Sequence, residues 1–398
     1  MIIYNKTWLK NLIIQDQMNL SVAAGDLSKE EFKNIETAYP VGFYSPNIFV
    51  RTGLFILTCV IALFGGCLLS YMFWDSGMVD SGGWILFLGL ISYITLELVV
   101  KNKHHFRSGT DDALIWISGG LFCVAFVWIT AQYNWYPDHY NADLLPPAPI
   151  VSFALILSLY LTLRFADSLM ALFCFLSALI LAVVLAVLHL SFGAAVIPFL
   201  VMLLSAVVYY FSYVSSNRVK FVYYLHCLRV LQAGSLLTLY LAGNYYVVQH
   251  LGNELYGYTS IGPYKVPYPV FFWPWTILVP FIYTGAGLYK KDIIPLRTGL
   301  ILIAIAAVTF KNYYHVLPIE STLVLIGLVT LGASYWVIRY LKVPKHGFTS
   351  EELQQDTIAG GINIESLIIA TSQPDTIHGT ENKFGGGDFG GGGSSSSF

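Results

Sequence analysis

The densest group of side chains that could do chemistry lies between His104 and Asp112, in the run His-His-Phe-Arg-Ser-Gly-Thr-Asp-Asp. Carboxylates beside imidazoles can bind a cation or relay a proton. The run also precedes a long apolar stretch, so it predicts a helix start at which Asp111, Asp112 or Thr110 would cap the free amides. Neighbouring helical residues diverge by about 100°, which makes it hard for both aspartates to hold one ion. Both interpretations stay open.

Two further carboxylates lie at the ends of apolar stretches, where an unpaired charge is costly. Glu97 precedes Lys101 by four residues, a spacing that favours an ion pair along one helix. Asp167 follows Arg164 by three residues, so these two could pair across the turn between them. Either carboxylate could instead belong to a polar site inside the membrane.

His226 and Arg229 share one face of an apolar segment, one turn inside it. Arg229 can extend its head toward water, although a carboxylate partner such as Glu97 or Asp167 would lower its cost further. The sequence thus predicts a candidate polar or transport site made of Glu97, Asp111, Asp112, Asp167, His226 and Arg229.

Signatures of enzymes are missing from the chain. It has no HExxH, GxSxG or Walker motif, and Gly234-Ser235 is a lone dipeptide. All five cysteines fall in apolar stretches without a CxxC pair, which predicts buried apolar side chains rather than disulfides or metal ligands. The net charge of -2 argues against nucleic-acid binding. We therefore expect no enzymatic activity, no cofactor, no metal and no nucleic-acid partner.

The elements that must position these residues are long apolar stretches. With 56% hydrophobic and only 11% charged residues, the chain repeats runs of roughly 20 apolar residues, each long enough to span a bilayer as a helix. We expect an all-α, polytopic transmembrane helix bundle with the lipid bilayer as its partner. Its ten expected spans are 51–73, 84–101, 112–132, 148–165, 168–190, 193–214, 222–247, 269–289, 294–312 and 318–340.

Loop charges predict the orientation of this bundle, since basic loops stay in the cytoplasm. Every second loop carries lysine or arginine, as in 101–107 and 290–297, whereas 74–83 and 133–147 carry neither. One alternation accounts for all loops, and it places both termini in the cytoplasm. Pro274 and Pro280 should interrupt the eighth span.

The two ends differ from the bundle. Residues 1–47 predict a cytoplasmic segment of two amphipathic helices, the second opened by a capping box at Ser28 and Glu31. Residues 342–378 form a polar tail, and 379–398 a Gly/Ser-rich tail that should be disordered. Either end could bind a protein partner, with the terminal Phe398 as one possible recognition handle.

Three short motifs resemble one family. The helix pair with Gly25, Ser28 and Glu31, the run 107–114, and the run 341–347 are similar to uncharacterised, Bacteroidetes-type bacterial membrane proteins with many helices. The resemblance implies the bacterial inner membrane and a short N-terminal helical module. It implies no activity, because this family has none established.

Two functions remain compatible with these patterns. The first is a non-catalytic membrane scaffold or interaction protein, which the two-helix N-terminus and the long tail favour. The second is a small-solute or ion transporter with a polar site near the cytoplasmic side. A transporter needs the ionisable side chains to converge on a cavity, whereas a scaffold leaves them at the interface.

Overall fold

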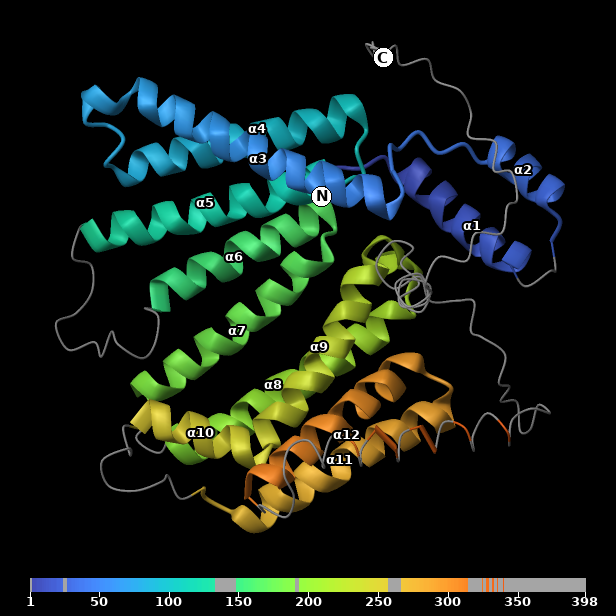
Figure 1. Cartoon of the computed structure of the whole chain (residues 1–398), viewed down its shortest axis with the longest axis vertical. Coiled ribbons are helices and arrows are strands. Elements are labelled where there is room, and N and C mark those ends of the chain that lie inside the picture. The colour runs from blue at the N-terminus through green and yellow to red at the C-terminus, as the bar shows by residue number, and fades with distance from the viewer. Residues whose placement is uncertain are drawn as a thin grey trace, which may run out of the picture. The chain divides into compact units, whose positions relative to one another are not determined.

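The computed structural model describes residues 2–23, 27–132, 148–189, 193–256 and 266–313, with single helical positions between 324 and 339. Its helices are α1 Lys6–Ala23, α2 Lys29–Ala38, α3 Ile48–Met72, η1 Trp74–Ser76, α4 Gly82–Lys103, α5 Thr110–Gln132, α6 Ala148–Phe165, α7 Ser168–His189, α8 Gly193–Ser216, η2 Val219–Tyr224, α9 Leu225–Gly243, α10 Tyr245–Tyr256, α11 Pro269–Lys290 and α12 Ile293–Tyr313 (Figure 1). The described part of the chain has no β-strand.

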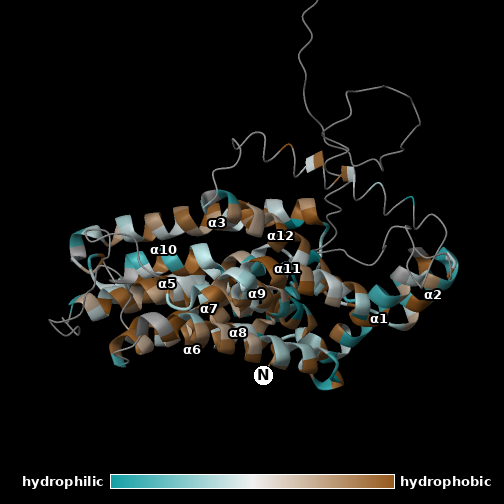
Figure 2. Cartoon of the chain, turned by 90° about the horizontal axis from the view of Figure 1, so that it is seen from below, coloured by the Kyte–Doolittle hydropathy of each residue, from teal (hydrophilic) through white to brown (hydrophobic). Residues whose placement is uncertain are grey.

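Nine helices in these ranges are long and apolar enough to cross a membrane. They are α3 to α9, with η2 continuing into α9, together with α11 and α12. Figure 2 shows that hydrophobic residues run along the long helices, while hydrophilic residues gather on α2. The expected all-α polytopic bundle is confirmed. The tenth expected span and both expected tails, 342–378 and 379–398, lie outside the described residues.

Helices that follow one another in the chain pack as pairs: α4 with α5, α6 with α7, α8 with α9, and α11 with α12 (Figure 1). Short connections favour this antiparallel arrangement of neighbours. The helix α3 differs, because it packs mainly against α5 and buries none of its residues. It is the most exposed span among those described.

The expected break at Pro274 and Pro280 is wrong, since α11 continues through both prolines. A proline at 280 cannot donate to the carbonyl of Thr276, four residues earlier. The hydroxyl of Tyr240 on α9 donates to that carbonyl instead, at 3.2 Å. A neighbouring helix thus satisfies the freed acceptor, which lets the proline stay inside a membrane helix.

The seventh span ends earlier than expected, and a separate helix, α10, follows it. The buried Asn244 divides the two helices by capping α10: its Oδ1 accepts from the amides of Tyr246 and Val247. Its Nδ2 donates to the Tyr240 hydroxyl at 3.1 Å and to Thr309 Oγ1 at 3.0 Å. The cap therefore ties α9 and α10 to α12.

The N-terminal helices dock on each other, and α1 with the segment before it docks on the bundle. The capping box is confirmed, because Ser28 accepts from the Glu31 amide and Glu31 accepts from that of Ser28. Gln15 donates to the Tyr39 carbonyl, which holds the end of α2 against α1. Tyr4 and Leu9 are buried in a core that also contains residues of α4, α5 and α6. The segment before α1, the first half of α1 and Phe43 thus share a core with the spans.

Candidate functional site

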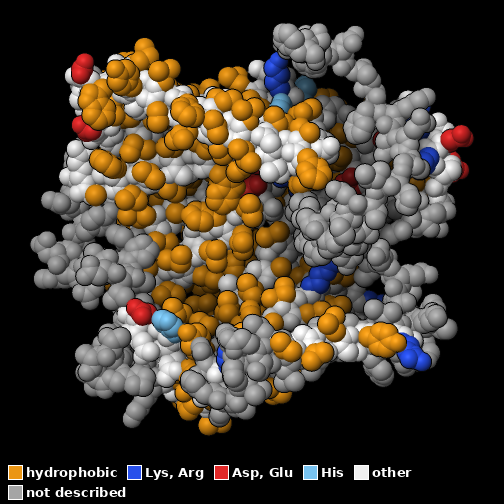
Figure 3. Space-filling view, in the orientation of Figure 1, with side chains coloured by type: hydrophobic (Ala, Val, Ile, Leu, Met, Phe, Trp, Pro, Cys, Tyr) orange, Lys and Arg blue, Asp and Glu red, His pale blue; other side chains and the backbone are white. Residues whose placement is uncertain are grey.

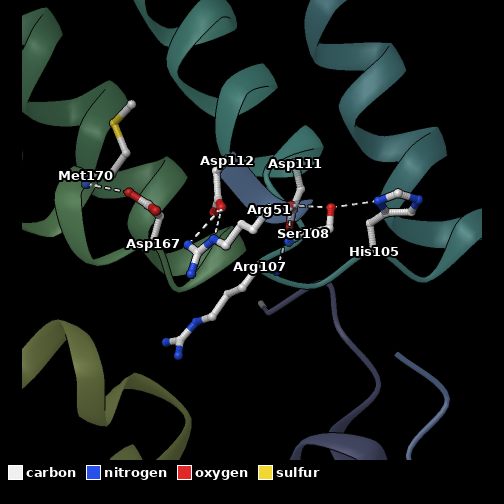
Figure 4. A network of polar contacts seen from close by, with 8 residues as sticks. All are labelled: Arg51, His105, Arg107, Ser108, Asp111, Asp112, Asp167 and Met170. Carbon is white, nitrogen blue, oxygen red and sulfur yellow. Dashed lines mark hydrogen bonds and ion pairs between the residues drawn. The ribbon is translucent and has the colours of Figure 1, made fainter. Parts of the chain in front are cut away.

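Four elements meet where the candidate polar residues lie: the start of α3, the turn 104–109, the start of α5, and the start of α7 (Figure 4). The turn is shaped by left-handed backbone at His104, Arg107 and Gly109. Tyr44 pairs with it from the N-terminal segment, donating to the His104 carbonyl at 3.0 Å and accepting from Phe106 at 3.3 Å. These two backbone hydrogen bonds to Tyr44 therefore hold the turn against the N-terminal segment.

Asp112 pairs with an arginine that sequence reasoning did not connect to it. Both Nε and Nη2 of Arg51 on α3 lie 2.8 Å from Asp112 Oδ2. The side chains are 27% and 15% exposed, so this is a largely sheltered ion pair. The helices can approach so closely because Gly109 has no side chain: a Cβ there would collide with the Arg51 carbonyl oxygen.

Asp111 faces the turn instead of an ion. Its carboxylate accepts from the amides of Arg107 and Ser108, each at 2.8 Å, and from the Ser108 hydroxyl at 2.9 Å. His105 Nδ1 lies 2.7 Å from the same hydroxyl. Asp111 is buried, and these bonds compensate its burial. The two aspartates point in different directions, as expected for adjacent helical residues (Figure 4).

Asp167 caps α7, since its Oδ1 accepts from the Met170 amide at 2.6 Å. Burial raises the pKa of this carboxyl above its ordinary range, although the Met170 bond and nearby Arg107 act in the opposite direction. The expected local pair with Arg164 does not form. Capping geometry turns the carboxylate toward its own helix.

Arg107 is the charged residue of this cluster whose side chain has the fewest polar contacts with described residues. Its guanidinium points away from Asp111 and Asp112, and no hydrogen bond to it is formed by a described residue (Figure 4). It lies 5.3 Å from the ring centre of Phe106. Burial lowers the pKa of Arg107, and the charges of Arg51 and Asp112 act on it in opposite directions.

Glu97 belongs to a second, separate group. It accepts from Lys101 at 2.8 Å, which confirms the expected pair along α4. It also accepts from Arg164 Nη2 on α6 at 2.7 Å and from the Tyr93 hydroxyl at 2.8 Å. The Tyr93 hydroxyl is also 2.6 Å from that of Tyr160. This group links α4 to α6 at the same end of the spans as Asp167.

The structure does not bring Arg229 to either carboxylate expected for it. Glu97 and Asp167 have the partners just described, and the side chains of His226 and Arg229 are exposed on α9. Both act electrostatically on each other, and Arg107 acts on His226. Of the six candidate residues, Asp111, Asp112 and Asp167 gather in one cluster (Figure 4), Glu97 belongs to a second group, and His226 and Arg229 are exposed on α9.

Sequence reasoning missed Arg51, Arg164 as a partner of Glu97, and Ser108. The sequence offered a signal for Arg51, because it is the single charged residue of the first apolar span. A charge in such a position usually pairs with an opposite charge inside the protein. Metal binding finds no support in the described residues, because no three His, Cys, Asp or Glu side chains gather there. The described cysteines are all unpaired thiols.

Comparison of the chain with protein-family models, curated proteins and solved structures finds no match. Its class therefore follows from its own fold. The chain is a polytopic α-helical membrane protein with a polar cluster at one end of its spans.

Proposed function

We propose that this chain is a non-catalytic membrane interaction protein that presents its N-terminal helical hairpin, α1–α2, to a protein partner in the cytoplasm. The observation that carries the proposal is the contrast between the two helices. Helix α1 is fastened to the bundle, whereas α2 buries none of its residues. A helix held in place with its surface free is suited to recognition.

The fastening of α1 supports a fixed position for the hairpin. Tyr4 packs edge-on against Phe106 with ring centres 4.9 Å apart, and the Ile3 amide donates to the Arg164 carbonyl at 3.0 Å. Burial raises the pKa of the Tyr4 phenol well above its ordinary value, as expected for a neutral core residue. A partner bound to α2 would thus be connected to the cytoplasmic ends of α4, α5 and α6.

The pairing of the carboxylates also supports a structural role. Asp112 is paired with Arg51, Asp111 with the turn, Asp167 with its helix, and Glu97 with Lys101 and Arg164. Groups that are already paired within the chain stabilise the bundle without needing a solute. Basic loops favour a cytoplasmic location for both termini, and the family resemblance favours the bacterial inner membrane.

Site-specific photo-cross-linking in native membranes tests this proposal. A photo-reactive residue at exposed Glu36 of α2 should give one discrete protein adduct, and the same residue at exposed Lys220 of η2 should give none. The adduct should disappear when Glu30→Lys and Lys33→Glu together exchange two charges on the exposed surface of α2. No adduct at Glu36, or an equal adduct at both positions, would overturn the proposal.

A small-solute or ion transporter is the second candidate, and one observation favours it. The ion pair Arg51–Asp112, the buried Asp167 and Arg107 gather from α3, the start of α5, the start of α7 and the turn 104–109 at one end of the spans. Such a cluster could hold a proton or an ion. Proton flux in liposomes that depends on Asp112, and is lost in Asp112→Asn, would establish transport over the scaffold.

A further inference from the structure

A lateral groove separates α3 from α4 and α5. Its volume is about 960 Å³, and its lining is almost entirely apolar. The helix α3 is tied at both ends of the groove: Arg51 pairs with Asp112 at one end, and Trp84 Nε1 donates to Ser70 Oγ at 2.9 Å at the other. Between these ties the groove stays open, because Thr58, Ala62, Gly66 and Ser70 present small side chains at every fourth position.

We propose that this groove binds one hydrocarbon chain of an anionic phospholipid, taken from the leaflet on the Lys103 side. The groove opens on the apolar surface of the spans, since its lining residues Ile61, Leu63 and Ile91 are exposed. Figure 3 shows hydrophobic side chains covering this part of the molecule. Apolar surface at this depth contacts lipid chains or another helix, and the dimensions of the groove select the lipid.

Length is the first argument for a lipid chain. The lining runs from Thr58 to Tyr71 on α3, about 20 Å at the helical rise of 1.5 Å per residue, and it also includes Trp74. One leaflet contributes about 15 Å of hydrocarbon, half of a core about 30 Å thick. A partner helix would have to continue across the whole core, whereas the lining of the groove covers only about 20 Å of α3.

Charge is the second argument. Ile91, Thr95 and Val99 line the groove along one face of α4, and a further step of four residues reaches Lys103, the last residue of that helix. Lys103 is exposed, and no described residue forms an ion pair with it. On α3, Arg51 lies two turns before Thr58, on the same face. The groove thus ends beside Lys103 at headgroup depth, next to the Arg51–Asp112 ion pair, and the free charge of Lys103 favours a phosphate.

Gly66→Leu tests the chain-binding part. No atom lies within 4 Å of a Cβ at Gly66, so leucine fits but fills the groove. Gly120→Leu on α5 is the matched control, because that glycine is also open and lies outside the groove. In native mass spectrometry of the full chain from a mild detergent, the wild-type protein and Gly120→Leu should retain one phospholipid. Gly66→Leu should lose it at least tenfold.

Lys103→Gln tests the headgroup part in nanodiscs of equal phosphatidylglycerol and phosphatidylcholine. The wild-type protein should retain phosphatidylglycerol preferentially, and Lys103→Gln should lower this preference about fivefold, while Lys220→Gln should leave it unchanged. Absence of bound lipid in the wild-type protein would overturn the proposal. Equal loss in both glycine variants would do the same, as would a dimer that only Gly66→Leu dissociates, because the groove would then hold a second copy.

Discussion

At the scale of single residues, the charges of this protein are organised by pairing across helices. Arg51 reaches Asp112, and Arg164 reaches Glu97, between positions 61 and 67 residues apart in the chain. These side chains are less than one third exposed, so removing one partner leaves the other with reduced hydration and no equivalent ion pair. The energetic importance of a charge in this bundle therefore depends on its partner more than on its depth.

Arg164→Leu should consequently destabilise the protein more than Arg229→Leu. The first change removes the shortest bond of Glu97, which should cost about 2 kcal/mol, whereas exposed Arg229 should cost within about 0.5 kcal/mol. Reversible unfolding in detergent micelles measures both. If Arg229→Leu costs as much as Arg164→Leu, then Arg229 has an intramembrane partner after all.

Asp167 should make stability fall with rising pH. Its folded pKa is raised by burial, so the folded state holds this proton more tightly than the unfolded state, whose pKa is about 3.9. The contribution is therefore fully present below the unfolded pKa and is lost as pH rises through the folded pKa. Asp167→Asn keeps an acceptor for the Met170 amide, so its unfolding midpoint should depend less on pH between pH 4 and 7.

The exposed Asp80→Asn is the control for this experiment and should follow the wild-type profile. A wild-type midpoint that falls no more steeply over the same pH interval than that of Asp167→Asn would contradict the assignment, because Asp167 would then contribute nothing to the pH dependence.

At the scale of elements, backbone groups that a helix leaves without a partner are bonded by side chains from outside that helix. Helix α11 carries Pro280 in its interior without a break because Tyr240 of α9 donates to the freed Thr276 carbonyl. Helix α10 starts at Asn244, which also joins α9 to α12. In a bilayer core no water can satisfy such groups, so the continuity of one helix depends on the side chains of the next.

Tyr240→Phe should destabilise the bundle by about 1–2 kcal/mol, because it leaves the Thr276 carbonyl without its donor and Asn244 without one acceptor. Pro280→Ala restores an amide that can bond the same carbonyl. The cost of Tyr240→Phe should therefore be smaller in the Pro280→Ala background, as measured by a double-mutant cycle in micelles. Equal costs in both backgrounds would show that Tyr240 does not compensate the proline.

At the scale of the whole molecule, polar and apolar side chains lie in different parts of the described chain. Ion pairs and the N-terminal hairpin gather where the basic loops lie, and the spans expose apolar side chains, above all on α3. Under the proposed function, this end of the bundle would contact a protein partner and the sides of the spans would contact lipid. This division depends on the orientation that the loop charges predict.

Labelling with a membrane-impermeant thiol reagent in intact cells tests that orientation. A cysteine at Asp80, in the loop between α3 and α4, should react from outside the cell. A cysteine at Lys220 should react only after the membrane is permeabilised, because its loop is basic. The wild-type protein, with its five native cysteines, gives the background. The reverse pattern would place both the hairpin and the Lys103 end of the groove outside.

The sequence alone determined the features that depend on local periodicity and spacing. Runs of about 20 apolar residues determined the described spans, the Ser28–Glu31 spacing determined the cap of α2, and the four-residue spacing determined the Glu97–Lys101 pair. Each of these features involves residues a few positions apart, so the helical repeat is sufficient to predict it.

Only the tertiary structure decided which faces meet. Membrane helices are apolar on nearly every side, so no stripe in the sequence marks the face that packs. The glycines show this: Gly119 lies against Leu161, whereas nothing lies within 4 Å of a Cβ at Gly65 or Gly66, which line the groove instead. The partners of Arg51 and Glu97, and the docking of Tyr4 on the bundle, likewise depend on contacts between distant segments, which neither local periodicity nor residue spacing can specify.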